Sequence, residues 1–367
     1  MIALAAAALL AWAYLLLLHG RFWSAGPVLA AQLPASAPPV DIVIPARDEA
    51  GSIGAAVRSL RAQDYAGTLR IVVVDDGSSD ATGELARAAG ADVIEGAPRP
   101  PGWSGKLWAV AQGVDATDAT LVLLTDADIV HDAGHVAALV ARAERNGLDL
   151  VSETVALRAV SGAERAPVPA FVFFFQLLYP FARVNDARSR VAAAAGGTML
   201  VRRSALVRIG GIASLRGALI DDVTLAQRIK RGGAIYLGHS ALARSLRPYP
   251  GAADIWRMVA RTAYVQLRFS PLLLIGTVLG LGLIWLLPPG LALFGQGAAR
   301  AMGAAAWAGS ALSYLPTLRR FGQNPGWAVA LPAIACFYMA ATIGSAIDHH
   351  RGRGIVWKNR AYRETLG

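Results

Sequence analysis

The residues Thr120-Leu121-Val122-Leu123-Leu124-Thr125-Asp126-Ala127-Asp128 decide how the rest of this chain is interpreted. The apolar run predicts a buried β-strand, and two carboxylates follow directly at its end. Like charges this close repel each other unless a cation compensates them. Mg²⁺ and Mn²⁺ are bound through one or two carboxylates together with the phosphates of a ligand. The motif therefore predicts a divalent cation that carries a diphosphate, in preference to a helix cap.

Strands and helices alternate around this motif, from residue 40 to about residue 155. A helix is expected over 50–62, and strands are expected at Val40–Pro45, Leu69–Val74, Asp92–Glu95, Thr120–Leu124 and Leu148–Thr154. Uninterrupted apolar strands between helices are typical of a parallel sheet covered on both faces. Ligands of such sheets bind beyond the carboxyl ends of the strands. Asp75, Asp76, Asp126 and Asp128 all stand there, so we predict an α/β fold with a mostly parallel sheet.

The composition indicates that part of the chain lies in lipid. The 367 residues are 55% hydrophobic and only 16% charged, with a net charge of +10 and a mean hydropathy of +0.44. These values are unusual for a water-soluble enzyme. The positive charge favours lipid headgroups and phosphorylated ligands over nucleic acid, for which no motif is present. The single Cys336 excludes an intrachain disulfide.

Apolar segments flank the α/β region at both ends. The charge of Arg21 follows the first apolar run, which predicts an uncleaved anchor over 1–20 with its N-terminus outside. Three further spans are expected within 271–348, at Leu272–Leu287, Ala298–Leu315 and Trp327–Ile347. The basic tail, 349–367, should remain in the cytoplasm. Three spans after a cytoplasmic domain would instead place the C-terminus outside. A hairpin at Pro288-Pro289-Gly290 or an interfacial segment would resolve this conflict. The aromatic run Phe171–Phe181, within 165–183, favours an interfacial helix over a buried one.

Several further residues are candidates for chemistry. Gly102–Lys106 is a small loop before a helix, where Lys106 either meets phosphate oxygens or is a solvated surface lysine. Asp221 and Asp222 either cap the next helix, expected over 222–231, or supply a carboxylate that takes a proton from a hydroxyl. A glycine-rich turn and strand are expected at 196–201. Arginines precede the second apolar region: Arg244, Arg247, Arg257, Arg261 and Arg268. Some of them form a positive-inside collar at the membrane, and one or two would also offset diphosphate charge. The histidines show no metal-ligand spacing.

The order of these motifs resembles that of the family 2 glycosyltransferases, which have the GT-A fold. The resemblance covers residues 38–270 and rests on Ile44–Glu49, Val74–Thr82, Gly105-Lys106, Asp126–Asp128, Gly196–Arg203 and Asp221–Arg228. The segment Trp256–Tyr264, the tail Trp357–Tyr362 and the apolar ends are most similar to the hopanoid-biosynthesis-associated glycosyltransferases. The resemblance implies a GT-A catalytic domain over 38–270, held at a cell inner membrane by several spans and facing the cytoplasm.

The resemblance also implies a role for each matching residue. Nucleotide-sugar contacts fall on Pro45, Glu49, Asp75, Asp76, Lys106, Asp126 and Arg261. Asp126 and Asp128 match the metal motif, with Asp128 as the direct ligand of Mg²⁺ or Mn²⁺. Asp222 matches the general base, and Asp221 stands where the family has Glu. Arg261 matches the arginine of a Gln-x-x-Arg-Trp motif, but Thr262 replaces its tryptophan, which argues against a processive polysaccharide synthase.

The implied activity is an inverting transfer of one sugar from a nucleotide sugar, expected to be a UDP-sugar, to a lipid hydroxyl. One alternative is a polyprenyl-phosphate glycosyltransferase, whose acceptor is already an anion and hardly needs a base. A second is a transporter or membrane scaffold with an inactive GT-A domain. Transporters carry ionisable residues inside their spans, whereas 272–287 and 327–347 contain none. The oligomeric state does not follow from the sequence.

Overall fold

The computed structural model describes residues 1–218, 220–352, 355–357 and 360–362. The chain folds into two compact units. The sheet unit contains Pro27–Arg158, Arg183–Pro248 and the described residues after 355, and the helical unit contains Met1–Gly26, Ala159–Ala182 and Tyr249–Ile355. Two parts of the expected 38–270 domain, residues 159–182 and 249–270, therefore pack within the helical unit. Arg353, Gly354, Lys358, Asn359 and residues 363–367 of the predicted basic tail lie outside the described residues.

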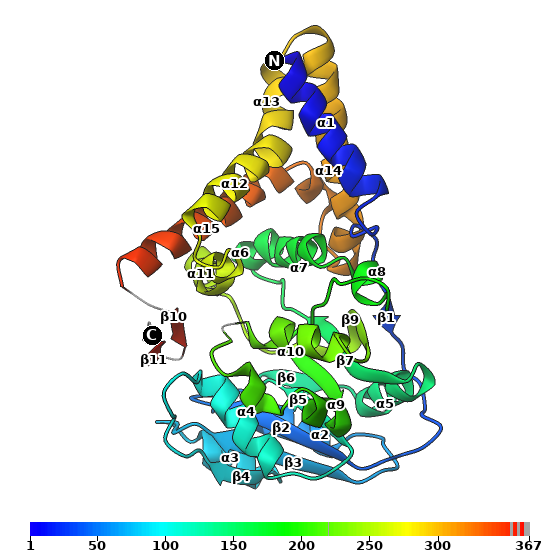
Figure 1. Ribbon diagram of the computed structural model, residues 1–367, viewed down its shortest axis with the longest axis vertical. Coiled ribbons are helices and arrows are strands. Elements are labelled where there is room, and N and C mark those ends of the chain that lie inside the picture. Colours follow the sequence, from blue (N-terminus) through cyan, green and yellow to red (C-terminus); the bar gives the residue numbers. More distant parts are fainter. Residues whose placement is uncertain (219, 353–354, 358–359, 363–367) are drawn as a thin grey trace. The chain divides into compact units, whose positions relative to one another are not determined.

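The sheet unit is built on a nine-stranded sheet (Figure 1). Four parallel strands, β4, β3, β2 and β5, form one side of it: Asp92–Glu95, Leu69–Asp75, Val40–Ala46 and Leu121–Thr125. Strand β8 (Thr198–Arg202) runs antiparallel between β5 and β7 (Leu148–Ala156). β9 (Ala234–Ser245) is parallel to β7, and β1 (Val28–Leu29) and β6 (Ile129–His131) border β9. The prediction of a mostly parallel sheet is confirmed.

Helices cover both faces of the sheet because successive strand side chains point to opposite sides. α2 (Ile53–Arg61) and α5 (His135–Arg145) supply Val57 and Leu139 to a core with Ile42 and Ile71. α4 (Gly105–Asp115) packs Ala109 against the other face, on Val72 and Val74. The remaining helices of the sheet unit are α3 (Thr82–Ala88), α9 (Arg203–Arg208), a 3-10 turn (Ile212–Leu215) and α10 (Asp221–Lys230). α8 (Phe181–Val184) contains the point in the sequence where the division between the two units falls, after Ala182. The apolar residues of β2, β3 and β5 thus hold their carboxyl ends side by side.

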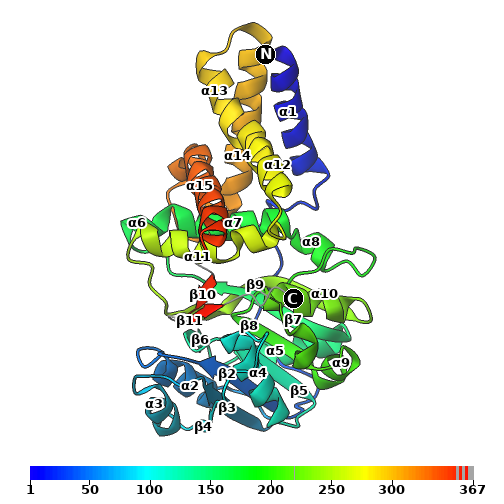
Figure 2. The same cartoon turned by 60° about the vertical axis from the view of Figure 1, so that its left-hand side comes forward.

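The helical unit contains the apolar helices. α1 (Ile2–Leu17) packs on α13 (Leu287–Phe294) and α14 (Gly297–Arg320), as Figure 2 shows. The other elements are α6 (Gly162–Arg165), α7 (Pro167–Leu178), α11 (Ala252–Gln266), α12 (Pro271–Leu281), a π-helix (Gly282–Leu286), a 3-10 turn (Pro325–Ala328) and α15 (Leu331–His350). Two short strands, β10 (Ile355–Trp357) and β11 (Arg360–Tyr362), pair near the C-terminus.

Two helical runs in the described part of the chain are long and apolar enough to cross a membrane, Pro271–Phe294 and Leu331–His350. The predicted span 298–315 is helical but is not one of them, and α1 is apolar but shorter. Pro288-Pro289-Gly290 lies inside the first run, so it does not form the hairpin that we considered. Proline at the start of α13 is tolerated because the preceding π-turn already interrupts the regular backbone hydrogen bonds.

The aromatic segment forms α7 and contributes one face to the core of the helical unit. Phe173 is fully buried, and its ring lies 5.0 Å from that of Tyr314 in an edge-on contact. Leu178, at the end of the helix, is 59% exposed. Edge-on aromatic contacts add to the free energy of burial, so α7 is anchored by its buried face. The interfacial role of the opposite face stays a prediction.

Candidate active site

A pocket in the sheet unit lies where the carboxyl end of β5 faces β8 and α10. Its polar lining comes from Lys106, Thr125, Asp126 and Asp221, together with the backbone of Gly196. Apolar residues complete it: Pro45, Leu107, Val110, Leu124, Met199, Ile212, Leu215 and Leu225. Three predicted nucleotide-contacting residues, Pro45, Lys106 and Asp126, thus line one cavity together with Asp221. Charged groups over an apolar floor are typical of small-molecule sites.

Lys106 is placed in the pocket by the first turn of α4. Ser104 caps this helix, because its Oγ accepts from the backbone N–H of Leu107 at 3.1 Å. Lys106 Nζ then lies 2.6 Å from Asp126 Oδ1. Burial alone would lower the pKa of Lys106, but the carboxylates of Asp126, Asp221 and Asp222 outweigh it and raise that pKa. Lys106 is therefore a charged partner of the acidic cluster and not a solvated surface lysine.

Asp126 lies among other carboxylates at the strand end. Burial raises its pKa first, and the negative charges of Asp128 and Asp221 raise it further, against the opposing effect of Lys106. An acidic group in this position is stabilised as an anion by any additional cation. The environment of Asp126 therefore supports binding of positive charge beyond that of Lys106.

Asp128 is held by the end of β9. Its Oδ2 accepts from Ser245 Oγ at 2.7 Å and from Arg247 Nε at 3.2 Å. The same guanidinium reaches Glu49 Oε1 at 2.7 Å. Arg247 thus joins the predicted metal motif to the predicted nucleotide-side turn. The sequence placed Arg247 in a basic cluster without a specific role, since Glu49 and Arg247 are 198 positions apart and no pattern pairs them.

Asp222 contacts both the glycine-rich turn and the first turn of its own helix. Its Oδ2 accepts from the Gly196 N–H at 2.9 Å, and its Oδ1 accepts from the Val223 N–H of α10 at 2.8 Å. A Cβ added at Gly196 would lie 3.2 Å from Asp222 Oδ2 and 3.5 Å from Lys106 Nζ. Burial and the neighbouring Asp221 raise the pKa of Asp222 to about 6, against the charge of Lys106. A pKa near neutrality is suited to a general base.

Asp75 and Asp76 lie at the adjacent strand end but do not line this pocket. Asp75 Oδ1 accepts from the backbone N–H of Ser78 at 2.8 Å and from its hydroxyl at 2.6 Å. Asp76 is buried, with its carboxylate 3.8 Å from Arg47 Nη1. The neighbouring turn interlocks with theirs through the 2.8 Å bond from the Glu49 N–H to Thr82 Oγ1. A nucleotide role for Asp75 and Asp76 stays a prediction.

Arg261 belongs to α11 of the helical unit, so it is not among the residues that the sheet unit brings together. The arginine that contacts Glu49 and Asp128 is Arg247. The role of Arg261 also stays a prediction.

The carboxylates fit a divalent cation that is completed by substrate. No cluster of three or more His, Cys, Asp or Glu side chains in the described residues is arranged to hold a metal ion. Asp126 and Asp128 nevertheless leave one turn together, in a site with excess negative charge. Mg²⁺ characteristically takes one or two carboxylates plus phosphate oxygens. The donor set therefore suits a cation that arrives with a phosphorylated ligand.

Comparison with known proteins supports this assignment. The family model described as "Glycosyl transferase family 2" matches residues 41–210. The 4,4'-diaponeurosporenoate glycosyltransferase of Staphylococcus aureus is 36% identical over 89 residues, which are 24% of this chain and 23% of that protein. The chain thus matches about a quarter of the length of that relative. A mannosyltransferase from Pyrobaculum calidifontis, solved with GDP-Man and Mn²⁺, has a TM-score of 0.60 at 23% identity, covering 95% of this chain and 98% of that one. This likeness establishes the GT-A fold.

Proposed function

We propose that this protein transfers one sugar from a nucleotide-sugar donor to a lipid hydroxyl. The premise is that residues 41–210 form a family 2 glycosyltransferase domain of GT-A fold. The observation that carries the proposal is the position of Asp222. Its carboxylate has a pKa raised to about 6 and belongs to the same acidic cluster as the Lys106–Asp126 pair. A base and a charge-binding group in one site are what this reaction needs.

The reaction is a single displacement with inversion at the anomeric carbon. The acceptor oxygen forms a bond to that carbon while its proton moves to an oxygen of Asp222. The bond from the carbon to the diphosphate breaks, and the nucleoside diphosphate leaves with the electron pair. Asp222 can accept the proton above pH 6 because it is then ionised.

Lys106 would stabilise the negative charge that develops on the leaving diphosphate. Its ammonium group is kept charged by three surrounding carboxylates, and a positioned cation in a site of this kind lowers the barrier to charge separation. When bound by Asp126 and Asp128, Mg²⁺ or Mn²⁺ would supply further positive charge to the donor phosphates. Arg247 holds Asp128 and Glu49 in place for this role.

The finer assignments rest on the composition and the resemblance described above. We infer a UDP-sugar donor, and a hopanoid or other glycolipid precursor as the acceptor. We also infer an inner-membrane location with the sheet unit in the cytoplasm, supported by the two apolar helical runs. The name of the Staphylococcus aureus relative states that it acts on 4,4'-diaponeurosporenoate. Asp75, Asp76 and Arg261 are the further nucleotide-sugar contacts that we propose.

The proposal is tested with Asp222→Asn in membranes that contain the full-length protein. Transfer of radiolabel from UDP-[¹⁴C]glucose and GDP-[¹⁴C]mannose to extracted lipids is measured for the variant and the wild type. We expect transfer to fall at least a hundredfold, which is the usual contribution of a general base. Full retention with a hydroxyl acceptor would exclude Asp222 as the base, and retention with a polyprenyl phosphate would support that alternative acceptor. A scaffold would bind neither nucleotide sugar, with or without Mn²⁺.

A further inference from the structure

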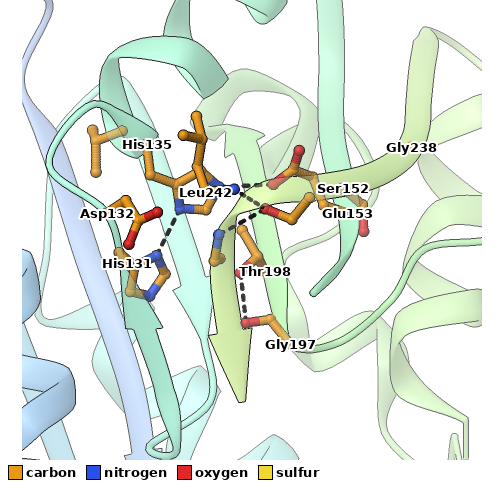
Figure 3. Close-up of polar contacts among 12 residues, drawn as sticks. His131, Asp132, His135, Ser152, Glu153, Gly197, Thr198, Gly238 and Leu242 are labelled. Atoms are coloured by element: carbon orange, nitrogen blue, oxygen red, sulfur yellow. Dashed lines mark hydrogen bonds and ion pairs between the residues drawn. The ribbon is translucent and has the colours of Figure 1, made fainter. Parts of the chain in front are cut away.

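A chain of four polar side chains runs from the pocket into the interior of the sheet unit. Thr125 Oγ1 lies 3.1 Å from His131 Nε2, and His131 Nδ1 lies 2.8 Å from His135 Nδ1. His135 Nε2 lies 2.7 Å from Glu153 Oε2. Figure 3 shows His131, His135 and Glu153 arriving from β6, α5 and β7, with the dashed contacts between them. His135 and Glu153 are 0% exposed, so the proposed reaction gives them no role.

The chain ends at the turn that holds the proposed base. Thr125 Oγ1 is also 2.9 Å from the Gly197 carbonyl, to which it can donate. This carbonyl accepts from the Asp126 N–H at 3.4 Å and from Thr198 Oγ1 at 2.8 Å. The adjacent Gly196 donates its N–H to Asp222. The direction in which the Thr125 hydroxyl donates therefore determines whether the Gly197 carbonyl receives this hydrogen bond, next to the Gly196 N–H that contacts the base.

The number of protons on the chain decides that direction. Two neutral imidazoles and a Glu153 carboxylate allow one pattern: His135 donates to Glu153, His131 donates from Nδ1 to His135, and Thr125 must donate to His131 Nε2. One additional proton, carried either by the Glu153 carboxyl group or by the His135 ring, reverses the pattern. His135 then donates from Nδ1 to His131, and His131 donates from Nε2 to Thr125. The Thr125 hydroxyl is thereby free to donate to Gly197.

The surroundings favour the state with the additional proton. Without it, Glu153 is a buried carboxylate whose second oxygen has no hydrogen-bond partner among the described residues, and such a charge is strongly disfavoured. Apart from the contact with His135, no ion pair of the described residues joins Arg142 or another cation to it. Arg142 of α5 lies 4.6 Å above the ring of Tyr236. Burial raises the pKa of Tyr236, so it remains neutral, and Asp132 pairs with Arg244 at 3.0 Å.

His131 itself stays neutral in this scheme. Burial, together with the adjacent His135, holds the pKa of His131 well below its ordinary value. The additional proton therefore belongs to the pair of His135 and Glu153, and His131 relays its effect by a change of tautomer. The rings of the two histidines are stacked, with centroids 5.0 Å apart, which keeps both in register for this exchange.

We propose that Glu153, His135 and His131 are positioning residues that turn the Thr125 hydroxyl toward the Gly197 carbonyl. The positioning steadies the Gly196-Gly197 turn and, through it, Asp222. Where the inference concerns activity, it rests on the proposed function.

The proton arrangement is tested without any assay of activity. Full-length protein labelled with ¹⁵N-histidine is studied by NMR in detergent micelles, and His131 is assigned from the signal lost in His131→Phe. We expect the wild type at neutral pH to carry the His131 proton on Nε2. A proton on Nδ1 at neutral pH would overturn the inference and leave the proposed function intact.

Kinetics test the consequence for the site. Thr125→Val should lower kcat about tenfold at neutral pH, because it removes the hydroxyl that contacts Gly197. His131→Phe should lower kcat less than Thr125→Val, because Thr125 then keeps Gly197 as its partner. The matched control is His239→Phe, which removes another buried histidine that contacts a threonine hydroxyl, that of Thr154 at 2.7 Å. A wild-type kcat in Thr125→Val, or an equal fall in His239→Phe, would contradict the inference.

Discussion

The backbone N–H of Gly196 donates a 2.9 Å hydrogen bond to Oδ2 of Asp222, 26 residues further along the chain. This bond brings the glycine-rich turn before β8 onto the first turn of α10. It also orients a carboxylate whose pKa is raised to about 6. Because a general base works only in its ionised form, this relationship determines how activity should depend on pH.

Activity is expected to rise with pH through about 6 and to level off above it. Below this value Asp222 is protonated and cannot take a proton from the acceptor. The measurement is kcat/KM for sugar transfer between pH 4.5 and 8 at constant ionic strength. An acidic limb with a midpoint below 5 would contradict the raised pKa.

Stability should change with pH in the opposite direction to activity. A raised carboxyl pKa destabilises the folded state as the pH rises from the pKa of the unfolded chain through 6. Asp222→Asn should therefore melt at a higher temperature than the wild type at pH 8, with little difference at pH 4.

Asp221→Asn should shift the acidic limb to lower pH. The negative charge of Asp221 is the second cause of the raised pKa of Asp222, after burial, so removing that charge favours ionisation. The limb is measured in the same way. Asp221→Glu keeps the charge and serves as the control, with an unchanged midpoint. A limb in Asp221→Asn that coincides with that of the wild type would show that the two carboxyl groups do not interact.

Lys106→Met should have the reverse effect on the limb and should also slow transfer. Lys106 opposes the rise in the pKa of both Asp126 and Asp222, so its loss raises the midpoint above 6. The loss of a positioned cation should also lower kcat a hundredfold or more. Lys106→Arg retains the charge and should recover part of the activity at the original midpoint. A variant with lower activity but an unmoved midpoint would separate the two effects and contradict the coupling.

Arg247→Ala should raise KM for the nucleotide sugar about tenfold, because an ion pair to a partly buried carboxylate contributes roughly 1.5 kcal/mol or more. The substitution leaves Glu49 and Asp128 without their shared partner. Arg244→Ala is the matched control, since Arg244 lies three residues away and pairs with the exposed Asp132. We expect KM to change less than twofold in the control. Equal effects of the two substitutions would indicate a general loss of positive charge.

Removal of divalent cations should abolish transfer, and added Mn²⁺ or Mg²⁺ should restore it. The physical reason is the excess negative charge around Asp126. Isothermal titration of Mn²⁺ with and without UDP is the direct measurement, and we expect tighter binding when the diphosphate is present. Asp128→Asn should weaken that binding. Activity that persists unchanged in EDTA would contradict the metal assignment.

Much of the fold follows from local patterns in the sequence. The apolar runs of β2, β3 and β5 predict parallel strands, since each lacks the alternation of a half-exposed strand. The turn and strand at 196–201 and the helix at 222–231 are found as β8 and α10. The helix expected at 50–62 begins three residues late, at Ile53. The preceding residues are held in the interlocked turns of Asp48 and Glu49.

The buried histidine chain shows where local patterns end. His131 and His135 lie four residues apart, a spacing that a sequence uses for many purposes. Only the packing of α5 on β7 brings Glu153 to His135 and thereby forms the buried pair. A carboxylate is recognised as buried and paired only when the elements that surround it are known.

By itself, the sequence determined the class of fold, the strand ends that carry acidic residues and the apolar character of both chain ends, because these depend on neighbours within a few residues. The tertiary structure decided which acids share a site. It paired Arg247 with Glu49 and Asp128, turned Asp222 toward Gly196, and left Asp75 in its own turn. These contacts join residues that are up to 198 positions apart, and the pKa of each group follows from the burial and charges that they create.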